Sequence, residues 1–194
     1  MSEKTGVSKW KVKQFWKLFF IGALLIMMLS LNLALAAPAA AATTVVAEQT
    51  AVSGLYMRLN AGVYAQIFTT GPSDTYANAV SLRLLGNQAN PPATIRVSIT
   101  ETTESGLPND SVLCSGTFTR NFYNTIGWWE ISLGSGASLA ANTRYAIVAT
   151  ADPCPGYVDW QGHYIADYAG GTAYYYSDSE WVLLPNVWSG SRAA

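Results

Sequence analysis

Lysine is absent from most of this sequence. All five lysines lie within the first 17 residues, and from Ala37 onward six arginines stand against eleven carboxylates, a net charge of −5. Proteins that bind nucleic acid or anionic lipid neutralise phosphates with a basic surface. A lysine-free, acidic domain lacks such a surface, so we expect no nucleic-acid partner and no membrane contact outside the N-terminal segment.

A helical apolar period is absent as well, because no window after residue 40 repeats its apolar residues at helical spacing. Short stretches alternate between apolar and polar residues instead, which is typical of strands with one buried face. The clearest inward positions are Val80, Leu82, Leu84, Ile95, Val97 and Ile99. About nine such stretches separated by turns predict an all-β fold, a two-sheet antiparallel sandwich of jelly-roll or Greek-key type.

The strongest alternation lies in residues 127–133 and 139–149. In the first stretch Trp129 shares a face with the apolar residues that follow, so Trp128 is expected on the opposite, outer face. Residues 134–138 contain two glycines and two serines, a composition typical of turns. We therefore expect the two stretches to be neighbouring strands at the centre of an antiparallel sheet.

Cysteine is scarce: the chain has two, Cys114 and Cys154. Two cysteines in an exported chain predict a disulfide, which would close a loop of about 40 residues and contribute roughly 4 kcal/mol. Two cysteines and one histidine do not complete a four-ligand zinc site without carboxylates. A redox pair is normally closer in sequence. We predict the disulfide and no metal centre.

The N-terminal segment has a basic part, residues 1–17, an apolar part, 18–35, and a small-x-small site ending at Ala36. This order predicts a secretory signal cleaved after Ala36, with an uncleaved signal anchor as the alternative. Both place the rest of the chain outside the cytoplasmic membrane, secreted or anchored.

Three segments follow from this pattern: a signal peptide or signal anchor forming an N-terminal hydrophobic helix (1–36), a low-complexity tether (37–54) and a β-sandwich domain (55–194). Within the tether, residues 43–50 are a candidate for strand addition to the sheet of a neighbouring subunit, as in a surface layer or filament.

Catalytic signatures are weak. His163 has Asp159 and Asp167 four residues away on either side, but no nucleophile motif accompanies it. Glu130 and Asp159 are candidates for a glycosidase pair, although Glu130 alternates with apolar residues and is expected to face water. We predict no enzyme activity, with a small glycoside-active enzyme as the weakest alternative.

No cofactor is predicted, and a structural calcium ion is the one possibility left open. Its candidate ligands lie in or near late loops: Asp152, Asp159, Asp167, Asp178 and Glu180.

Aromatic residues are concentrated in the last third of the chain. Flat rings with polar edges suit stacking on sugar rings and equally suit protein interfaces, although such rings also cover cores under long loops. We predict a non-catalytic module that binds a glycan or a surface protein through exposed aromatics. The predicted contact residues are Trp128, Trp160, Tyr164, Tyr175 and Trp188.

Several motifs together resemble a known family. They are Ala65-Gln66-x-Phe68-Thr69-Thr70-Gly71, Val80-x-Leu82-x-Leu84, Gly106-Leu107-Pro108, Leu139-Ala140-Ala141-Asn142-Thr143-x-Tyr145 and Tyr168-x-Gly170-Gly171-x-Ala173. The pattern, which covers about Val63 to Trp181, resembles the choice-of-anchor R type of domain, a β-sandwich of exported microbial surface proteins.

The resemblance implies an extracellular, surface-associated, non-catalytic domain with an undetermined ligand. Members usually end in a sorting signal. Residues 188–194 carry none, so we expect the N-terminal segment to be the anchor.

Overall fold

The computed structural model describes residues 47–49, 54–87, 91–163, 171–184, 188–189 and 191–193. The chain divides into two compact units, Met1–Ala42 and Thr43–Ala194, and every described residue belongs to the second unit. The predicted N-terminal helix and cleavage site therefore lie outside the described residues. Within the described part, no helix has the length and hydropathy needed to span a membrane.

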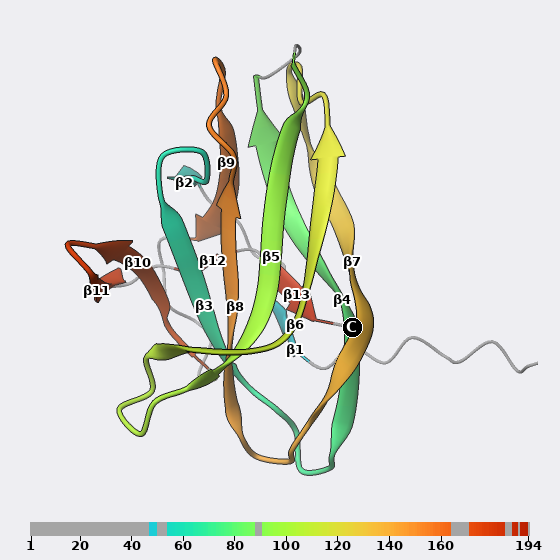
Figure 1. The fold of residues 1–194 in the computed structure, drawn as a ribbon, viewed down its shortest axis with the longest axis vertical. Helices are drawn as coiled ribbons and strands as arrows, with labels where there is room; N and C mark the ends of the chain where they lie inside the picture. Colours follow the sequence, from blue (N-terminus) through green and yellow to red (C-terminus); the bar gives the residue numbers. More distant parts are fainter. Residues whose placement is uncertain are drawn as a thin grey trace, which may run out of the picture. The chain divides into compact units, whose positions relative to one another are not determined.

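The described residues of the second unit form two antiparallel sheets (Figure 1). Sheet A has seven strands: β1 (Ala47–Gln49), β2 (Gly54–Arg58), β4 (Thr75–Gly86), β7 (Thr125–Leu139), β9 (Val158–His163), β12 (Trp188–Ser189) and β13 (Ser191–Ala193). Sheet B has six, in the order β11 (Glu180–Leu184), β10 (Ala173–Ser177), β3 (Val63–Thr69), β8 (Arg144–Ala151), β5 (Ala93–Thr102) and β6 (Pro108–Arg120). The predicted all-β, sandwich-like arrangement of two antiparallel sheets is confirmed.

The core lies between the two sheets and is built by period-two alternation. In sheet A, Leu82 and Leu84 of β4 are fully buried, while Arg83 between them is half-buried on the other face. In sheet B, Ile95 and Ile99 of β5 are fully buried and Arg96 is exposed. Burying apolar side chains stabilises the fold by roughly 25 cal/mol per Å². The face of each strand that carries the apolar side chains therefore points toward the core.

One prediction about the central stretches is wrong: they belong to different sheets. Residues 127–133 lie in β7, which pairs with β4, whereas residues 144–149 lie in β8, which pairs with β3 and β5. The predicted turn at 134–138 lies inside β7. Gly134 and Gly136 have φ values of 69° and 71°, which bend the strand as a bulge, and the register shifts between Ala77 and Ala79 opposite them.

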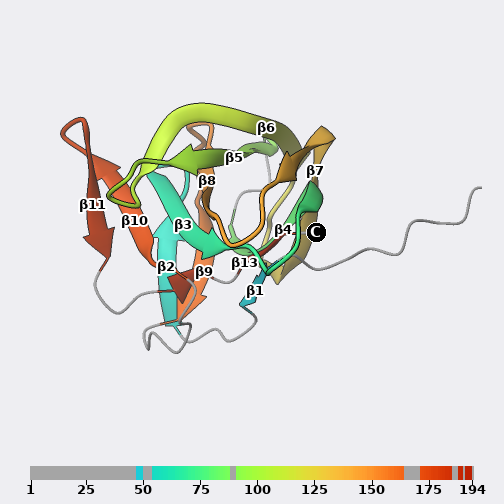
Figure 2. The same cartoon turned by 90° about the horizontal axis from the view of Figure 1, so that it is seen from below.

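The two sheets meet where the edge strand β6 runs beside β7, as the view from below shows (Figure 2). At this junction Gly116 of β6 lies against the backbone of β7. A Cβ atom built on Gly116 would fall 1.8 Å from the carbonyl oxygen of Ser132. The absence of a side chain at Gly116 therefore allows the two backbones to approach this closely.

The predicted disulfide is not formed in this structure, where both cysteines are free. Cys114 of β6 pairs with Ile99 of β5. On the other side of β5, Ala151 at the end of β8 pairs with Ile95, and the chain then leaves the sheet toward Cys154. Those two register positions are four residues apart on β5, roughly 13 Å along the strand. A disulfide needs Cα atoms within about 7 Å, so this register keeps the thiols apart.

We expect iodoacetamide to label Cys154 faster than Cys114 in the native protein. Burial raises the pKa of both thiols, but Cys154 is half-exposed and Cys114 is buried, and the exposed thiolate is the reactive form. Peptide mass spectrometry after timed labelling measures the two rates, and labelling in urea is the control in which they become similar. A Cys114–Cys154 linked peptide from non-reduced protein would contradict this register.

Strand β1 comes from the segment predicted to pair with a neighbouring subunit. Here Ala47–Gln49 pairs with β13 of the same chain, which in turn pairs with β4. The segment is therefore an added strand, but within its own sheet. Pairing between subunits stays a prediction.

Candidate functional site

Four strands of sheet A place one side chain each on a line across the outer face. The side chains are Tyr56 (β2), Gln161 (β9), Arg83 (β4) and Trp128 (β7), which we call the cross-strand row. Tyr56 pairs with Gln161 and Arg83 pairs with Trp128 in register. The two middle members are joined by a hydrogen bond in which Arg83 Nε donates to Gln161 Oε1 at 2.7 Å.

The row faces outward because its chain neighbours face the core. Met57, Leu84 and Trp160 are buried between the sheets, and successive side chains on a strand point to opposite faces. The two ends of the row are aromatic and exposed, with exposed fractions of 48% for Tyr56 and 37% for Trp128. Three strand spacings separate these ends, about 14 Å.

The middle of the row is polar and held in place. Gln161 has an exposed fraction of 6%, and its hydrogen bond from Arg83 fixes one amide oxygen and one guanidinium edge. A surface with two exposed rings at its ends and ordered hydrogen-bonding groups between them has the composition of a recognition site, in which apolar area supplies affinity and a few polar groups set orientation.

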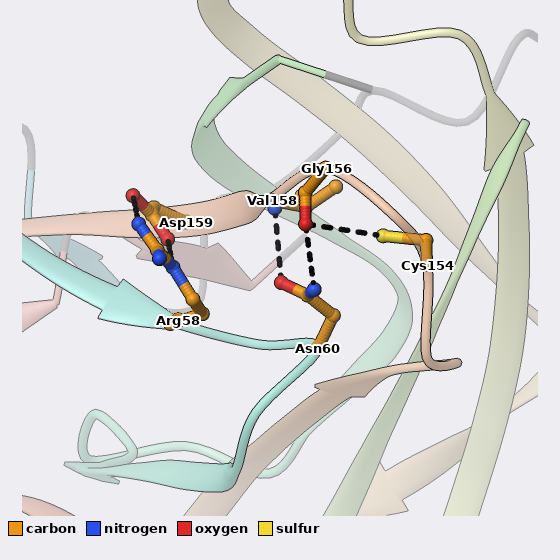
Figure 3. Close-up of polar contacts among 6 residues, drawn as sticks. All are labelled: Arg58, Asn60, Cys154, Gly156, Val158 and Asp159. Carbon is orange, nitrogen blue, oxygen red and sulfur yellow. Dashed lines mark hydrogen bonds and ion pairs between the residues drawn. The ribbon is translucent and has the colours of Figure 1, made fainter. Parts of the chain in front are cut away.

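A second line beside the row contains an ion pair. Arg58 of β2 contacts Asp159 of β9 through two bonds, Nε to Oδ1 at 3.0 Å and Nη2 to Oδ2 at 3.4 Å (Figure 3). The guanidinium carbon also lies 4.8 Å from the centre of the Tyr157 ring. The hydrogen bond to Asp159, with the charge of that carboxylate, raises the pKa of Arg58 above its ordinary value.

One asparagine side chain forms hydrogen bonds between the turn after β2 and the loop before β9. Asn60 donates from Nδ2 to the Gly156 carbonyl at 3.0 Å and accepts at Oδ1 from the Val158 amide at 3.2 Å (Figure 3). Because these bonds use backbone groups of the β8–β9 loop, they fix β2 against β9. Tyr56 and Gln161 are thereby kept in register.

The predicted contact residues fall in different places. Trp128 is exposed on the outer face, as expected from the alternation. Trp160 is fully buried and belongs to the core, so its prediction as a surface contact is wrong: it shares its face with Val158, which is also buried. Tyr175 is half-buried in β10 of sheet B, between Tyr64 and Val182, and does not join Trp128.

Two contact predictions are not decided. Tyr164 lies outside the described residues. Trp188 is placed in β12, opposite His163 on β9, but its side chain lies outside the described part of the chain.

The carboxylates considered for catalysis do not form a pair. Glu130 is opposite Ser81 and Asp159 is opposite Leu85, on the two sides of β4 and four residues apart along it. That offset alone is roughly 13 Å, beyond the separations of glycosidase pairs. His163 stands four residues after Asp159 on the same strand, so their backbones are equally far apart, and Asp167 lies outside the described residues.

Of the carboxylates considered for calcium, two are bound by arginines. Asp152 accepts from Arg96 at 2.9 Å through both oxygens, and Asp159 accepts from Arg58. Within the described residues no three potential metal-ligating side chains gather at one place.

Sequence reasoning missed three of the four row members. Tyr56 lies in Leu55-Tyr56-Met57-Arg58, which alternates apolar and polar residues and so carried a strand signal. No sequence pattern marked Arg83 and Gln161 as functional residues, because the contact between them depends on how strands far apart in the sequence pair.

No protein-family model matches this chain, and no curated protein is significantly similar to it.

Proposed function

We propose that this chain is a non-catalytic recognition module of the cell exterior, and that its cross-strand row binds carbohydrate. The observation that carries the proposal is the exposure of Trp128 and Tyr56 at the two ends of a polar row. Aromatic rings offer flat apolar faces for sugar rings. The guanidinium of Arg83, which is half-buried between them, offers hydrogen bonds to sugar hydroxyls.

The basic, apolar and small-residue order of residues 1–36 supports export, to a secreted or membrane-anchored location. The resemblance to choice-of-anchor R domains supports a role in adhesion at a microbial surface. We also propose a jelly-roll or Greek-key connectivity, since the chain passes between sheets from β3 to β4, from β6 to β7, from β7 to β8 and from β8 to β9.

Carbohydrate is preferred to a surface protein as the ligand because of the make-up of the row. Protein interfaces bury a dry, mainly apolar centre with a polar rim. The cross-strand row has the reverse order, with rings at the ends and a hydrogen-bonded polar pair in the centre. A polyhydroxylated ligand accepts hydrogen bonds from the remaining N–H groups of Arg83, whereas an apolar protein anchor buries them without a partner.

We expect Trp128→Ala to weaken glycan binding by at least about tenfold, because an aromatic anchor contributes roughly 2 kcal/mol or more at a recognition site. A glycan array probed with the purified chain and with Trp128→Ala measures the change. Tyr123→Ala is the matched control: Tyr123 is more exposed, at 63%, and lies in the turn between β6 and β7, outside the row.

Equal glycan binding by wild type and Trp128→Ala would remove the row from the binding site. A wild-type chain that binds no glycan would contradict the carbohydrate assignment, and would leave a surface protein as the ligand class to test.

A further inference from the structure

A second site lies on sheet B, away from the cross-strand row. A cavity of about 160 Å³ opens beside the ends of β3 and β8, under the loop that joins β5 to β6. Hydroxyl groups, a phenol and a guanidinium line it: Thr69, Ser105, Thr172, Tyr174 and Arg144. In small-molecule sites, a few convergent polar groups fix the orientation of the ligand.

The walls of the cavity are fixed by backbone hydrogen bonds. Arg144 pairs with Thr69 in register, and its carbonyl accepts from the Thr102 hydroxyl at 3.3 Å. On the opposite wall the Thr172 carbonyl accepts from the amide of Ile67 at 2.8 Å. The cavity is therefore built from paired strands rather than from a single loose loop.

The loop over the cavity is held by hydrogen bonds between its own backbone groups, and it lies against Arg144. The amides of Thr103 and Gly106 donate to the carbonyls of Leu107 and Thr103, each at 2.8 Å. Gly106 has a φ of 82°, and a Cβ atom there would lie 3.1 Å from Nη1 of Arg144. The bare backbone at Gly106 thus lets the loop lie against the guanidinium.

Arg144 is distinguished by what its side chain does not contact. Five arginine side chains are described, and four have a partner: Arg58 and Arg96 a carboxylate, Arg83 an amide, and Arg120 the ring of Trp129, at 3.9 Å from its centre. Among the described residues no such partner is found for Arg144. Its guanidinium therefore offers all five N–H donors to a ligand.

We propose that this cavity binds a carboxylate group of an acidic sugar, held by Arg144. A guanidinium matches a carboxylate with two parallel hydrogen bonds. One cation in a domain of net charge −5 neutralises a monovalent carboxylate but not a divalent phosphate. The surrounding hydroxyls suit the sugar hydroxyls, and the ring of Tyr174 supplies a flat wall. This proposal stands apart from the carbohydrate function of the cross-strand row.

The test is an NMR titration of the full chain with sodium glucuronate and, in parallel, with glucose. Glucose has the same ring without the carboxylate, so it isolates the contribution of the charge. We expect glucuronate to shift the amide signals of Thr69, Gly106 and Thr172 in a saturable way, and glucose to leave them in place. Sodium sulfate, as a third probe, tests whether any anion suffices.

Arg144→Gln removes the charge and shortens the side chain while keeping it polar, and we expect it to weaken glucuronate binding by at least about tenfold. Arg96→Gln is the matched control, because it makes the same change in net charge at an exposed side chain of β5 and should change the affinity less than about twofold. Melting curves establish that both variants fold.

Three results would overturn the proposal: no saturable shift with glucuronate, equal affinity in folded Arg144→Gln, or sulfate binding as tightly as glucuronate. Trp128→Ala should leave this titration unchanged. The proposal therefore stands or fails independently of the cross-strand row.

Discussion

Gly116→Ala is expected to lower the free energy of unfolding by about 3 kcal/mol or more. The added methyl group would lie 1.8 Å from the carbonyl oxygen of Ser132 and 2.9 Å from its carbonyl carbon. Both are backbone atoms, so no side-chain rotation relieves the overlap, and β6 has to move away from β7. Overpacking of this kind typically costs 1–3 kcal/mol, and more where the backbone itself has to shift.

Urea denaturation followed by circular dichroism measures this loss. Gly71→Ala is the control, since beyond its two chain neighbours no residue has a heavy atom within 4 Å of a Cβ built at Gly71, and such a substitution changes stability by no more than about 0.5 kcal/mol. If the Gly116→Ala and Gly71→Ala proteins unfold at the same urea concentration, β6 and β7 do not approach each other as described.

The second large effect is expected at Trp160, where substitution by alanine should cost about 3–5 kcal/mol. Trp160 is fully buried in the core between the sheets, so its removal loses the transfer energy of a large ring and leaves a cavity. A domain of this size has a total stability of roughly 5–15 kcal/mol. We therefore expect a marginally folded protein.

The contrast with Trp128→Ala makes this prediction specific. Trp128 has an exposed fraction of 37% and lies on the outer face, so its truncation should cost no more than about 1 kcal/mol. Thermal unfolding of both variants under the same conditions gives the comparison. Similar melting temperatures for the two would mean that the burial of Trp160 is wrong. The same contrast shows that lost ligand binding in Trp160→Ala reports unfolding rather than a contact.

The alternation of side chains predicted the faces of the central strands well. Val80, Leu82 and Leu84 point inward as expected, and Trp128 points outward because Trp129 packs on the core. The same rule applied to Tyr157-Val158-Asp159-Trp160 places Trp160 with Val158 and so inside. The error at Trp160 came from treating an aromatic-rich region as surface rather than following the alternation.

The alternation of side chains could not predict which strands pair with each other. Period two tells which face a residue occupies, but it does not tell which strand lies alongside. The assignment of β7 and β8 to one sheet failed for this reason. Gly134 and Gly136 indicated an irregular backbone. Glycines are typical both of a bulge within one strand and of a turn between two strands, so they did not distinguish the two.

The cross-strand row illustrates the same limit for function. Its four members come from β2, β4, β7 and β9, so more than 100 positions in sequence separate Tyr56 from Gln161. Only pairing in register brings them to one line. The sequence supplied Trp128 as a candidate, while its polar neighbours Arg83 and Gln161 became candidates once the sheet was known.

The most direct test of the carbohydrate function follows the indole N–H signals of the tryptophans by NMR, assigned with single Trp→Phe variants. The chain is titrated with the glycan that binds most tightly on the array. The signal of Trp128 is predicted to shift with ligand concentration, while that of Trp160, enclosed in the core, stays in place. A glycan that binds while the Trp128 signal remains unmoved would contradict the proposed function of this face.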